Sequence, residues 1–230
     1  MEERGRESGD YVQVYVWDWQ TRLLHWINAS LVLTLIVLAL GAEWLEGLGV
    51  AEEAIESVEL LHAYLGHVLI VTFALRIIWG FAGNEYARWS DIIPYRIRNW
   101  KEMWGNIRWI LGGFRGVPPV SFGHNPFASL FYCALFLVLI SQAISGLVLS
   151  GEEFGMFPGS LLAGGAVAGE GEESELAGAF EELHEFGHWF IIFFVFAHIF
   201  GLLIHELGER RGLLSSMVHG RKFYRKDELD

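Results

Sequence analysis

Histidine is the residue type in this chain whose placement could do chemistry. His184 and His198 lie fourteen residues apart within one apolar run. On an α-helix this spacing corresponds to about 21 Å along the axis and leaves the two side chains within about 40° of each other. Neutral imidazole binds both haem iron and zinc. The spacing therefore indicates two metal ligands on one helix face at two depths.

The start of the same run offers a second interpretation. Residues 184–188 read HEFGH and match H-E-x-x-H, in which two histidines bind zinc and the glutamate is the base of a metalloprotease. A third ligand would have to come from elsewhere, and His62 could supply it. No Asp or Glu lies deep in any apolar run, however, and the motif stands at the end of its run. A zinc protease is therefore the weakest of our interpretations.

The composition places these histidines in a membrane. Hydrophobic residues make up 53% of the 230 residues and charged residues only 19%, and four apolar runs are each long enough to cross a bilayer as a helix. The predicted spans are residues 23–42, 58–83, 126–150 and 184–206. We predict an all-α fold, an integral membrane four-helix bundle that forms a single membrane domain over residues 1–230. The single cysteine excludes an internal disulfide, a C-x-x-C-H haem attachment and a cysteine-bound iron–sulfur cluster.

The charges between the spans predict the orientation. All 16 Lys and Arg lie on one side of the predicted bundle, whereas the loops at residues 43–57 and 151–183 have no base and carry five and eight Glu. By the positive-inside rule both termini are cytoplasmic and the acidic loops face outward, which predicts a multi-pass protein of the cytoplasmic (inner) membrane. Residues 95–111 alternate bases with Trp and Ile, which predicts an interfacial helix in contact with membrane lipid. The net charge of −12 argues against a nucleic-acid partner.

This orientation pairs four histidines by depth. His62 matches His184 near the outer face, and His25 matches His198 near the inner face. Facing imidazoles at each depth suit two b-type haems, and the absence of Met from the spans disfavours a His/Met haem. Glycines one helical turn from three of these histidines would leave room for porphyrin: Gly66, Gly187 and Gly201. Any single histidine in a span could equally be hydrogen-bonded core or part of a proton path.

The remaining histidines of the spans fit the pairs less well. His67 lies about 140° around the helix from His62 and is expected to face elsewhere. His188 follows His184 by one turn, offset by about 40°. His205 stands at the inner end of the last span, where it would meet headgroups, haem propionates or a proton route.

Five motifs along the chain are shared with one known family. They are VYVWDWQTRLLHW before and into the first span, LLHAYLGHVLIVTFALRIIWGFAGNEYAR in and after the second, GHNPFA at residues 123–128, HEFGHWFIIFFVFAHIF in the fourth and SSMVHG near the end. Together they cover nearly the whole chain, and the R-I-x-W-x-F-x-G-N and G-H-N-P patterns are the most specific. The chain resembles the cytochrome b subunit of membrane-bound nickel–iron hydrogenases.

The resemblance implies a cofactor set, a partner and a direction of electron flow. It implies two b haems, with matching axial-ligand positions at His25, His62, His184 and His198. The implied partners are the small and large subunits of a nickel–iron hydrogenase on the outer face, which pass electrons to the outer haem. The inner haem would then reduce a membrane quinone, menaquinone or ubiquinone. The chain would have no hydrogen-activating site of its own.

The site of quinone reduction is expected near the inner haem. His124 and Asn125 stand at the inner start of the third span, where they could bind a quinone oxygen or relay protons. They could instead cap the helix whose first turn contains Pro126. An alternative function keeps both haems but changes the partner: a dihaem cytochrome b that acts alone or serves another dehydrogenase, such as formate dehydrogenase.

Overall fold

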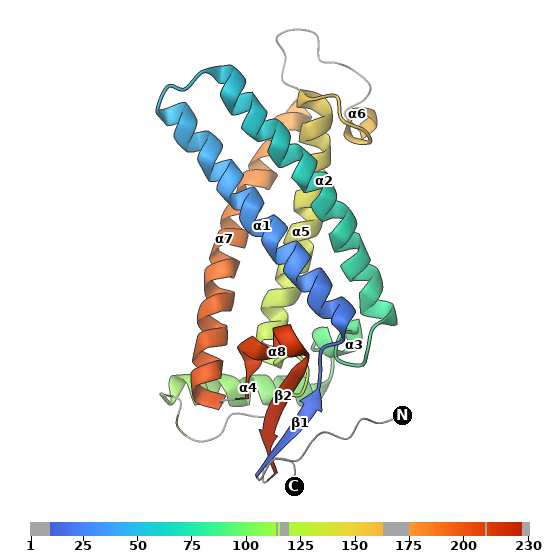
Figure 1. Ribbon diagram of the computed structural model, residues 1–230, viewed down its shortest axis with the longest axis vertical. Helices are drawn as coiled ribbons and strands as arrows, with labels where there is room; N and C mark the ends of the chain where they lie inside the picture. Colours follow the sequence, from blue (N-terminus) through green and yellow to red (C-terminus); the bar gives the residue numbers. More distant parts are fainter. Residues whose placement is uncertain (1–9, 114, 116–119, 163–174, 210, 227–230) are drawn as a thin grey trace. The chain divides into compact units, whose positions relative to one another are not determined.

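Four long helices dominate the computed structural model, which describes residues 10–113, 115, 120–162, 175–209 and 211–226. They are α1 (Trp19–Gly47), α2 (Glu52–Ala82), α5 (Pro126–Glu153) and α7 (Glu175–Glu209) (Figure 1). All four are long and apolar enough to cross a membrane. The helical fold and the four predicted spans are confirmed, and the chain is a multi-pass membrane protein.

The helices extend beyond the apolar runs into acidic sequence. Only residues 48–51 separate α1 from α2, so most of the predicted acidic loop at 43–57 is helical. Glutamate is a good helix former, and Glu52 and Glu53 in the first turn of α2 stabilise this helix by interacting with the positive end of its dipole. The predicted loop at 151–183 contains a short helix, α6 (Gly159–Leu162), and the start of α7. Residues 163–174 of that loop lie outside the described part of the chain.

The chain divides into two compact units, and each long helix contributes to both. The terminal unit contains residues 1–25, 75–134 and 194–230, and the middle unit contains residues 26–74 and 135–193. His25 and His198 belong to the terminal unit, whereas His62 and His184 belong to the middle unit. Each unit thus holds one of the two predicted histidine pairs.

The terminal unit contains a two-stranded antiparallel sheet that the all-α prediction lacked. Strand β1 (Tyr11–Tyr15) pairs with β2 (Arg221–Arg225), with Tyr11 opposite Arg225 (Figure 1). Each strand has only five residues, and the partners are about two hundred residues apart in sequence, so no local pattern indicates the pairing. The sheet brings the two ends of the described chain together.

A cluster of hydrogen bonds around Asp18 joins the N-terminal segment to the end of α2. The Asp18 carboxylate caps α1 by accepting from the Thr21 amide (2.8 Å), and it also accepts from the Asn84 amide (3.1 Å) and from the indole of Trp79 (3.3 Å). Burial alone would raise the pKa of Asp18, but these donors outweigh it and the pKa is lowered. Asn84 also donates to the carbonyl of Val16 (2.7 Å). The W-x-F-x-G-N motif therefore anchors the start of α1.

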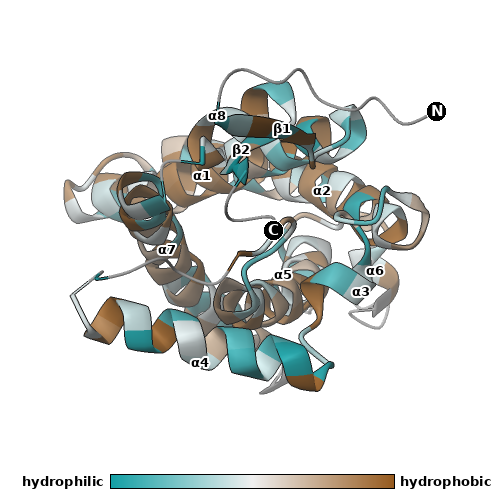
Figure 2. Cartoon of the chain, turned by 90° about the horizontal axis from the view of Figure 1, so that it is seen from below, coloured by the Kyte–Doolittle hydropathy of each residue, from teal (hydrophilic) through white to brown (hydrophobic). Residues whose placement is uncertain are grey.

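Helix α4 (Ile97–Leu111) follows the short helix α3 (Trp89–Ile92) and is amphipathic (Figure 2). Its buried face carries Met103, Asn106 and Trp109, whereas Trp100 and Trp104 are exposed. The predicted helix at 95–111 is thus found two residues shorter. An exposed apolar stripe beside basic residues is typical of a helix that lies on a membrane surface, which stays a prediction.

The C-terminal helix α8 (Leu213–His219) is fixed to the N-terminal segment. Ser216, at its centre, accepts a hydrogen bond from the indole of Trp17 (3.2 Å). Gly220 ends the helix with φ of +84°, and a Cβ there would overlap the Trp17 carbonyl. The SSMVHG motif therefore closes the terminal unit rather than supplying a ligand.

Candidate functional site

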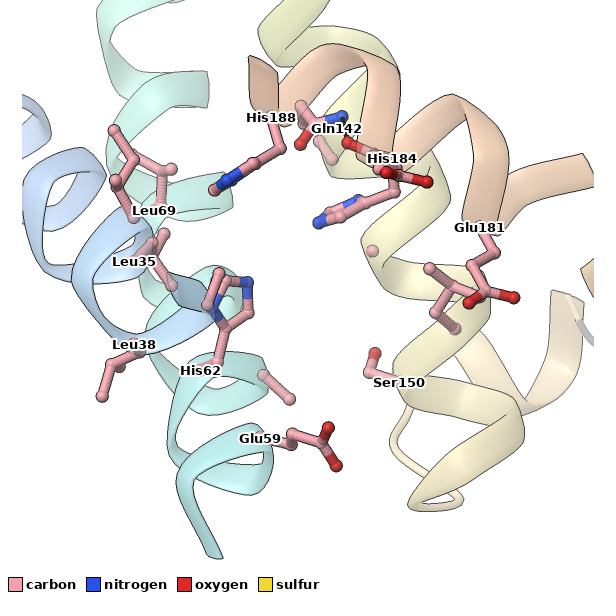
Figure 3. Close-up of a pocket in the computed structure, with 18 of the residues that line it drawn as sticks. Leu35, Leu38, Glu59, His62, Leu69, Gln142, Ser150, Glu181, His184 and His188 are labelled. Carbon is pink, nitrogen blue, oxygen red and sulfur yellow. Dashed lines mark hydrogen bonds between the residues drawn. The ribbon is translucent and has the colours of Figure 1, made fainter. Parts of the chain in front are cut away.

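The middle unit encloses a cavity between its four helical segments. Its volume is about 1010 Å³, the upper end of the range for ligand pockets. Apolar side chains form much of the wall, among them Leu35, Leu69, Phe73 and Ile191. His62 on α2 and His184 on α7 turn their rings into this space from different helices (Figure 3).

The two rings are spaced for a shared metal ion. Their centroids lie 6.3 Å apart with an interplanar angle of 68°. A metal–imidazole bond is about 2 Å, so two imidazoles on opposite sides of one iron have centroids about 6 Å apart. The structure therefore brings His62 and His184 together as the depth argument predicts.

Ser145 fixes the orientation of the His184 ring. The Ser145 hydroxyl donates to the Ser141 carbonyl (2.8 Å), which leaves its oxygen to accept from Nδ1–H of His184 (2.9 Å). The tautomer that carries its proton on Nδ1 has its lone pair on Nε2, the nitrogen available to a metal. A hydrogen bond of this kind is the usual support of a metal-bound histidine. Ser145 is fully buried, and sequence reasoning missed it because serine is common in membrane helices.

The second histidine pair lies in the terminal unit among aromatic rings. His25 is within electrostatic range of His198 and of Arg76. The His198 ring stacks on Phe194, with centroids 5.7 Å apart and planes 10° apart, and meets Tyr132 edge-on at 5.9 Å. The predicted partners His25 and His198 are thus near each other.

The residues predicted for a quinone or proton role have different surroundings. Asn125 caps α5, since its Oδ1 accepts from the Phe127 amide (2.9 Å) while its Nδ2 donates to Asn106 on α4 (3.0 Å). His124 instead donates to a carboxylate, that of Asp91, 2.7 Å from its Nδ1. Burial lowers the pKa of His124, and Asp91 opposes that shift. Sequence reasoning missed Asp91, which lies in the short helix α3 and belongs to no recognisable motif.

Comparison with known proteins decides the family. The model of the family described as prokaryotic cytochrome b561 matches residues 16–220. The chain belongs to this family. It is 28% identical to the "Probable Ni/Fe-hydrogenase B-type cytochrome subunit" of Azotobacter chroococcum mcd 1, with 99% of each chain covered. It is 27% identical to the "Probable Ni/Fe-hydrogenase 1 B-type cytochrome subunit" of Escherichia coli (strain K12), with 96% of this chain and 95% of the relative covered.

The middle unit of this cytochrome fits a haem b. The cavity offers two imidazoles from facing helices, and apolar side chains suit the porphyrin faces. Gly146 allows the His184 ring to pack closely against α5, because a Cβ at this position would lie 3.3 Å from the ring carbon Cε1. His62 and His184 would hold the iron, with Ser145 behind His184.

The three glycines predicted to make room for porphyrin have different surroundings in the structure. Gly66 lines the cavity, and a Cβ at this position would meet nothing within 4 Å. A Cβ on Gly187 would overlap the amide of Gln142, which donates to the His184 carbonyl (3.0 Å), so close packing of α5 and α7 already explains this glycine. Space around Gly201 is open. A role in haem packing stays a prediction for all three.

Two histidines expected to be incidental also line the cavity. His67 does so, contrary to the expectation that it faces elsewhere, while its Nδ1 is 2.8 Å from the Ala63 carbonyl one turn earlier. The helical-wheel argument failed because a long side chain on the flank of a helix still reaches a wide cavity. His188 also turns its ring toward the same space (Figure 3).

Seven glutamates share the lining of this cavity, and no Lys or Arg is among the described lining residues. They are Glu43, Glu46, Glu59, Glu152, Glu153, Glu181 and Glu185. Glu43 and Glu46 reach it because α1 continues as a helix beyond its apolar run. The surroundings of the middle-unit histidines are therefore negative.

Proposed function

We propose that this cytochrome passes electrons from an outward-facing nickel–iron hydrogenase, through an outer and then an inner haem b, to membrane quinone. In this proposal His62 and His184 hold the outer haem, and His25 and His198 hold the inner haem. The observation that carries the proposal is the His62/His184 pair across a cavity of cofactor size, in a chain that aligns with hydrogenase B-type cytochrome subunits over nearly its full length. Haem iron held by two histidines takes up and releases single electrons.

The described residues support the outer site in three ways. His62 and His184 provide two nitrogen ligands. The hydrogen bond between Ser145 and Nδ1 of His184 leaves the lone pair of Nε2 free to bind the iron. Apolar side chains in the cavity wall suit the faces of a porphyrin. The glutamates give the outer side a negative charge, which would attract a partner with a basic surface.

The inner site rests on His25 and His198, with the quinone on the same side of the chain. Menaquinone and ubiquinone both present two oxygens that need protons on reduction. Charge placement supports this direction, because the bases of the chain gather in the terminal unit and would face the cytoplasm.

Haem content and partner content test the proposal together. The chain is purified in mild detergent from its native membrane, and haem b, nickel and iron are measured per chain. Two haems b and a co-purifying nickel–iron subunit pair are expected. One haem would disprove the dihaem assignment, and an intact dihaem chain that never carries nickel would favour the alternative, a cytochrome b that acts alone or serves another dehydrogenase such as formate dehydrogenase.

A further inference from the structure

We propose that Asp91 and His124 form the proton-donating pair for quinone reduction, with His124 in contact with the quinone oxygen and Asp91 as its positioning residue. This inference rests on the proposed function and assigns one of its chemical steps to named residues. Reduction of a quinone to a quinol takes two electrons from the inner haem, one at a time, and two protons. Both protons come from water on the cytoplasmic side: one passes through Nε2 of His124 to the quinone oxygen that it contacts, and the other reaches the second oxygen from water directly.

The hydrogen bonds of Asp91 determine which nitrogen of His124 is available. One oxygen of Asp91, Oδ2, accepts from both Nδ1–H (2.7 Å) and the backbone amide (2.9 Å) of His124. The carboxylate is fixed against the preceding backbone, since a Cβ on Gly123 would overlap it. With Nδ1 committed to Asp91, Nε2 is the nitrogen that gains and releases a proton.

Aromatic contacts connect His124 to the predicted inner ligand. The His124 ring meets the Tyr132 ring edge-on at 5.6 Å, and Tyr132 meets His198 at 5.9 Å. His124 is therefore one aromatic ring away from the residue predicted to bind the inner haem. A quinone that receives electrons at that haem would lie within reach of the imidazole.

The two side chains of the pair differ in exposure. The side chain of Asp91 is 26% exposed, whereas that of His124 is 15% exposed. In the proposed relay the more exposed carboxylate therefore lies nearer to water, and the imidazole to which it is hydrogen-bonded passes the proton to the quinone. Asn125, the neighbouring residue, has its amide committed to the helix cap and to α4, which separates it from this role.

Charges on the surrounding elements set the balance of protonation of His124. Asp91 on α3 favours the imidazolium, whereas Lys222 on β2 and Arg76 on α2 disfavour it. Tyr132 on α5 and Trp17 in the N-terminal segment contribute ring contacts to His124. Of these three charged groups, Asp91 is the one that stabilises the protonated ring, so its removal should shift proton delivery toward lower pH.

The test uses the intact complex with its hydrogenase partner in detergent, with hydrogen as the electron source and a short-chain ubiquinone analogue as acceptor. Two rates are followed from about pH 4.5 to about pH 8, a range that extends well below the ordinary pKa of an imidazole: the reduction of the haems and the reduction of the quinone. His124→Ala should slow quinone reduction about a hundredfold while haem reduction is unchanged. Asp91→Asn should slow quinone reduction about tenfold. The pH at which the rate falls to half its maximum should drop by about one unit or more, because the imidazolium loses its counter-charge.

Two control variants separate proton delivery from structural support. Asp91→Glu keeps the charge and should retain the wild-type pH profile. Glu85→Gln removes an exposed carboxylate from the same loop and should leave both rate and profile unchanged. A pH profile that Asp91→Asn leaves unmoved overturns the inference, even if the rate falls, because an anchor for the loop has no pH signature of this kind.

Failure of the proposed function would look different. If the wild-type complex reduced its haems but never the quinone, quinone reduction by this chain would be wrong and the inference would fall with it. If the wild type reduced quinone and both His124→Ala and Asp91→Asn behaved as wild type, only the inference would fail.

Discussion

The His62/His184 pair of the middle unit and the His25/His198 pair of the terminal unit consist of the same residue type but have charges of opposite sign near them. Seven glutamates line the cavity of the first pair. The second pair has Arg76 within electrostatic range and aromatic rings packed on His198. Negative surroundings stabilise oxidised haem iron and positive surroundings stabilise the reduced form. The difference would therefore make the middle-unit haem the better electron donor and the terminal-unit haem the better acceptor.

Replacement of a proposed haem ligand should have the largest effect and tests the difference between the two sites directly. His184→Ala should lose the middle-unit haem and His198→Ala the terminal-unit haem, so haem b per chain should fall from about two to about one in each case. The measurement is haem content with redox titration of the remaining absorbance band. The titration should leave the higher-potential haem in His184→Ala and the lower-potential haem in His198→Ala.

A histidine in the same cavity serves as the control for those variants. His67→Ala should keep both haems, because it is the His62 ring that faces the His184 ring, with centroids 6.3 Å apart. Retention of two haems by His184→Ala would show that the ligand pairing is wrong, and His188, one turn away, would then be the first residue to replace in addition.

The support of His184 by Ser145 predicts the next largest effect. Ser145→Ala removes the acceptor for Nδ1–H, and loss of such a supporting hydrogen bond typically lowers metal affinity about 10- to 100-fold. The middle-unit haem should be retained on purification but lost faster to apomyoglobin, as measured by absorbance. Ser150→Ala is the matched control, since Ser150 is buried on the same helix and its hydroxyl donates to the Leu147 carbonyl. Equal loss rates in the two variants would argue against the Ser145 role.

Removal of negative charge tests whether the glutamates lower the midpoint potential of the middle-unit haem. The double variant Glu43→Gln with Glu46→Gln should raise the midpoint potential of the middle-unit haem by tens of millivolts and narrow its gap to the other haem. High salt should reduce the effect, because these carboxylates are partly solvated. Glu102→Gln on α4 belongs to the terminal unit and should leave the middle-unit potential in place. A double variant with an unchanged potential would show that the glutamates serve partner docking only.

Stability against pH gives the smallest effect, confined to the terminal unit. Lys222 is buried, with Nζ 2.9 Å from the Phe122 carbonyl and 2.8 Å from that of Gly123. Burial lowers the pKa of Lys222 to about 8, while Glu209 and Asp91 oppose the shift. Above this pKa the folded chain releases the proton before the unfolded chain does, so the contribution of Lys222 to stability rises between pH 8 and its ordinary pKa of about 10.5.

Removal of the amine should abolish that rise. Lys222→Met should flatten the dependence of the thermal midpoint on pH over this window, by a few degrees at most, as measured by circular dichroism in detergent. Arg225→Met, on the same strand but exposed, should leave the slope as in the wild type. A wild-type slope in Lys222→Met would show that the buried amine does not titrate in this window.

Sequence patterns predicted the elements of the site better than its contacts. The apolar runs gave the four helices, and helical periodicity put His184 and His198 on one face, because the pitch of an α-helix is fixed. The same reasoning misplaced His67, and it did not foresee that Gln142 packs against Gly187. Neither outcome could be read from one helix, because each depends on what a second helix presents.

Hydrophobicity, helix pitch and shared motifs were enough to predict a four-span membrane cytochrome with histidines suited to two haems, because all three are properties of the linear chain. The groups that support those histidines could be identified only in the folded protein. Ser145 lies 39 residues from His184, and Asp91 lies 33 residues from His124, in sequence that has no distinguishing local pattern. A hydrogen bond needs two groups within about 3 Å in the right direction, and that proximity arises when separate segments pack together.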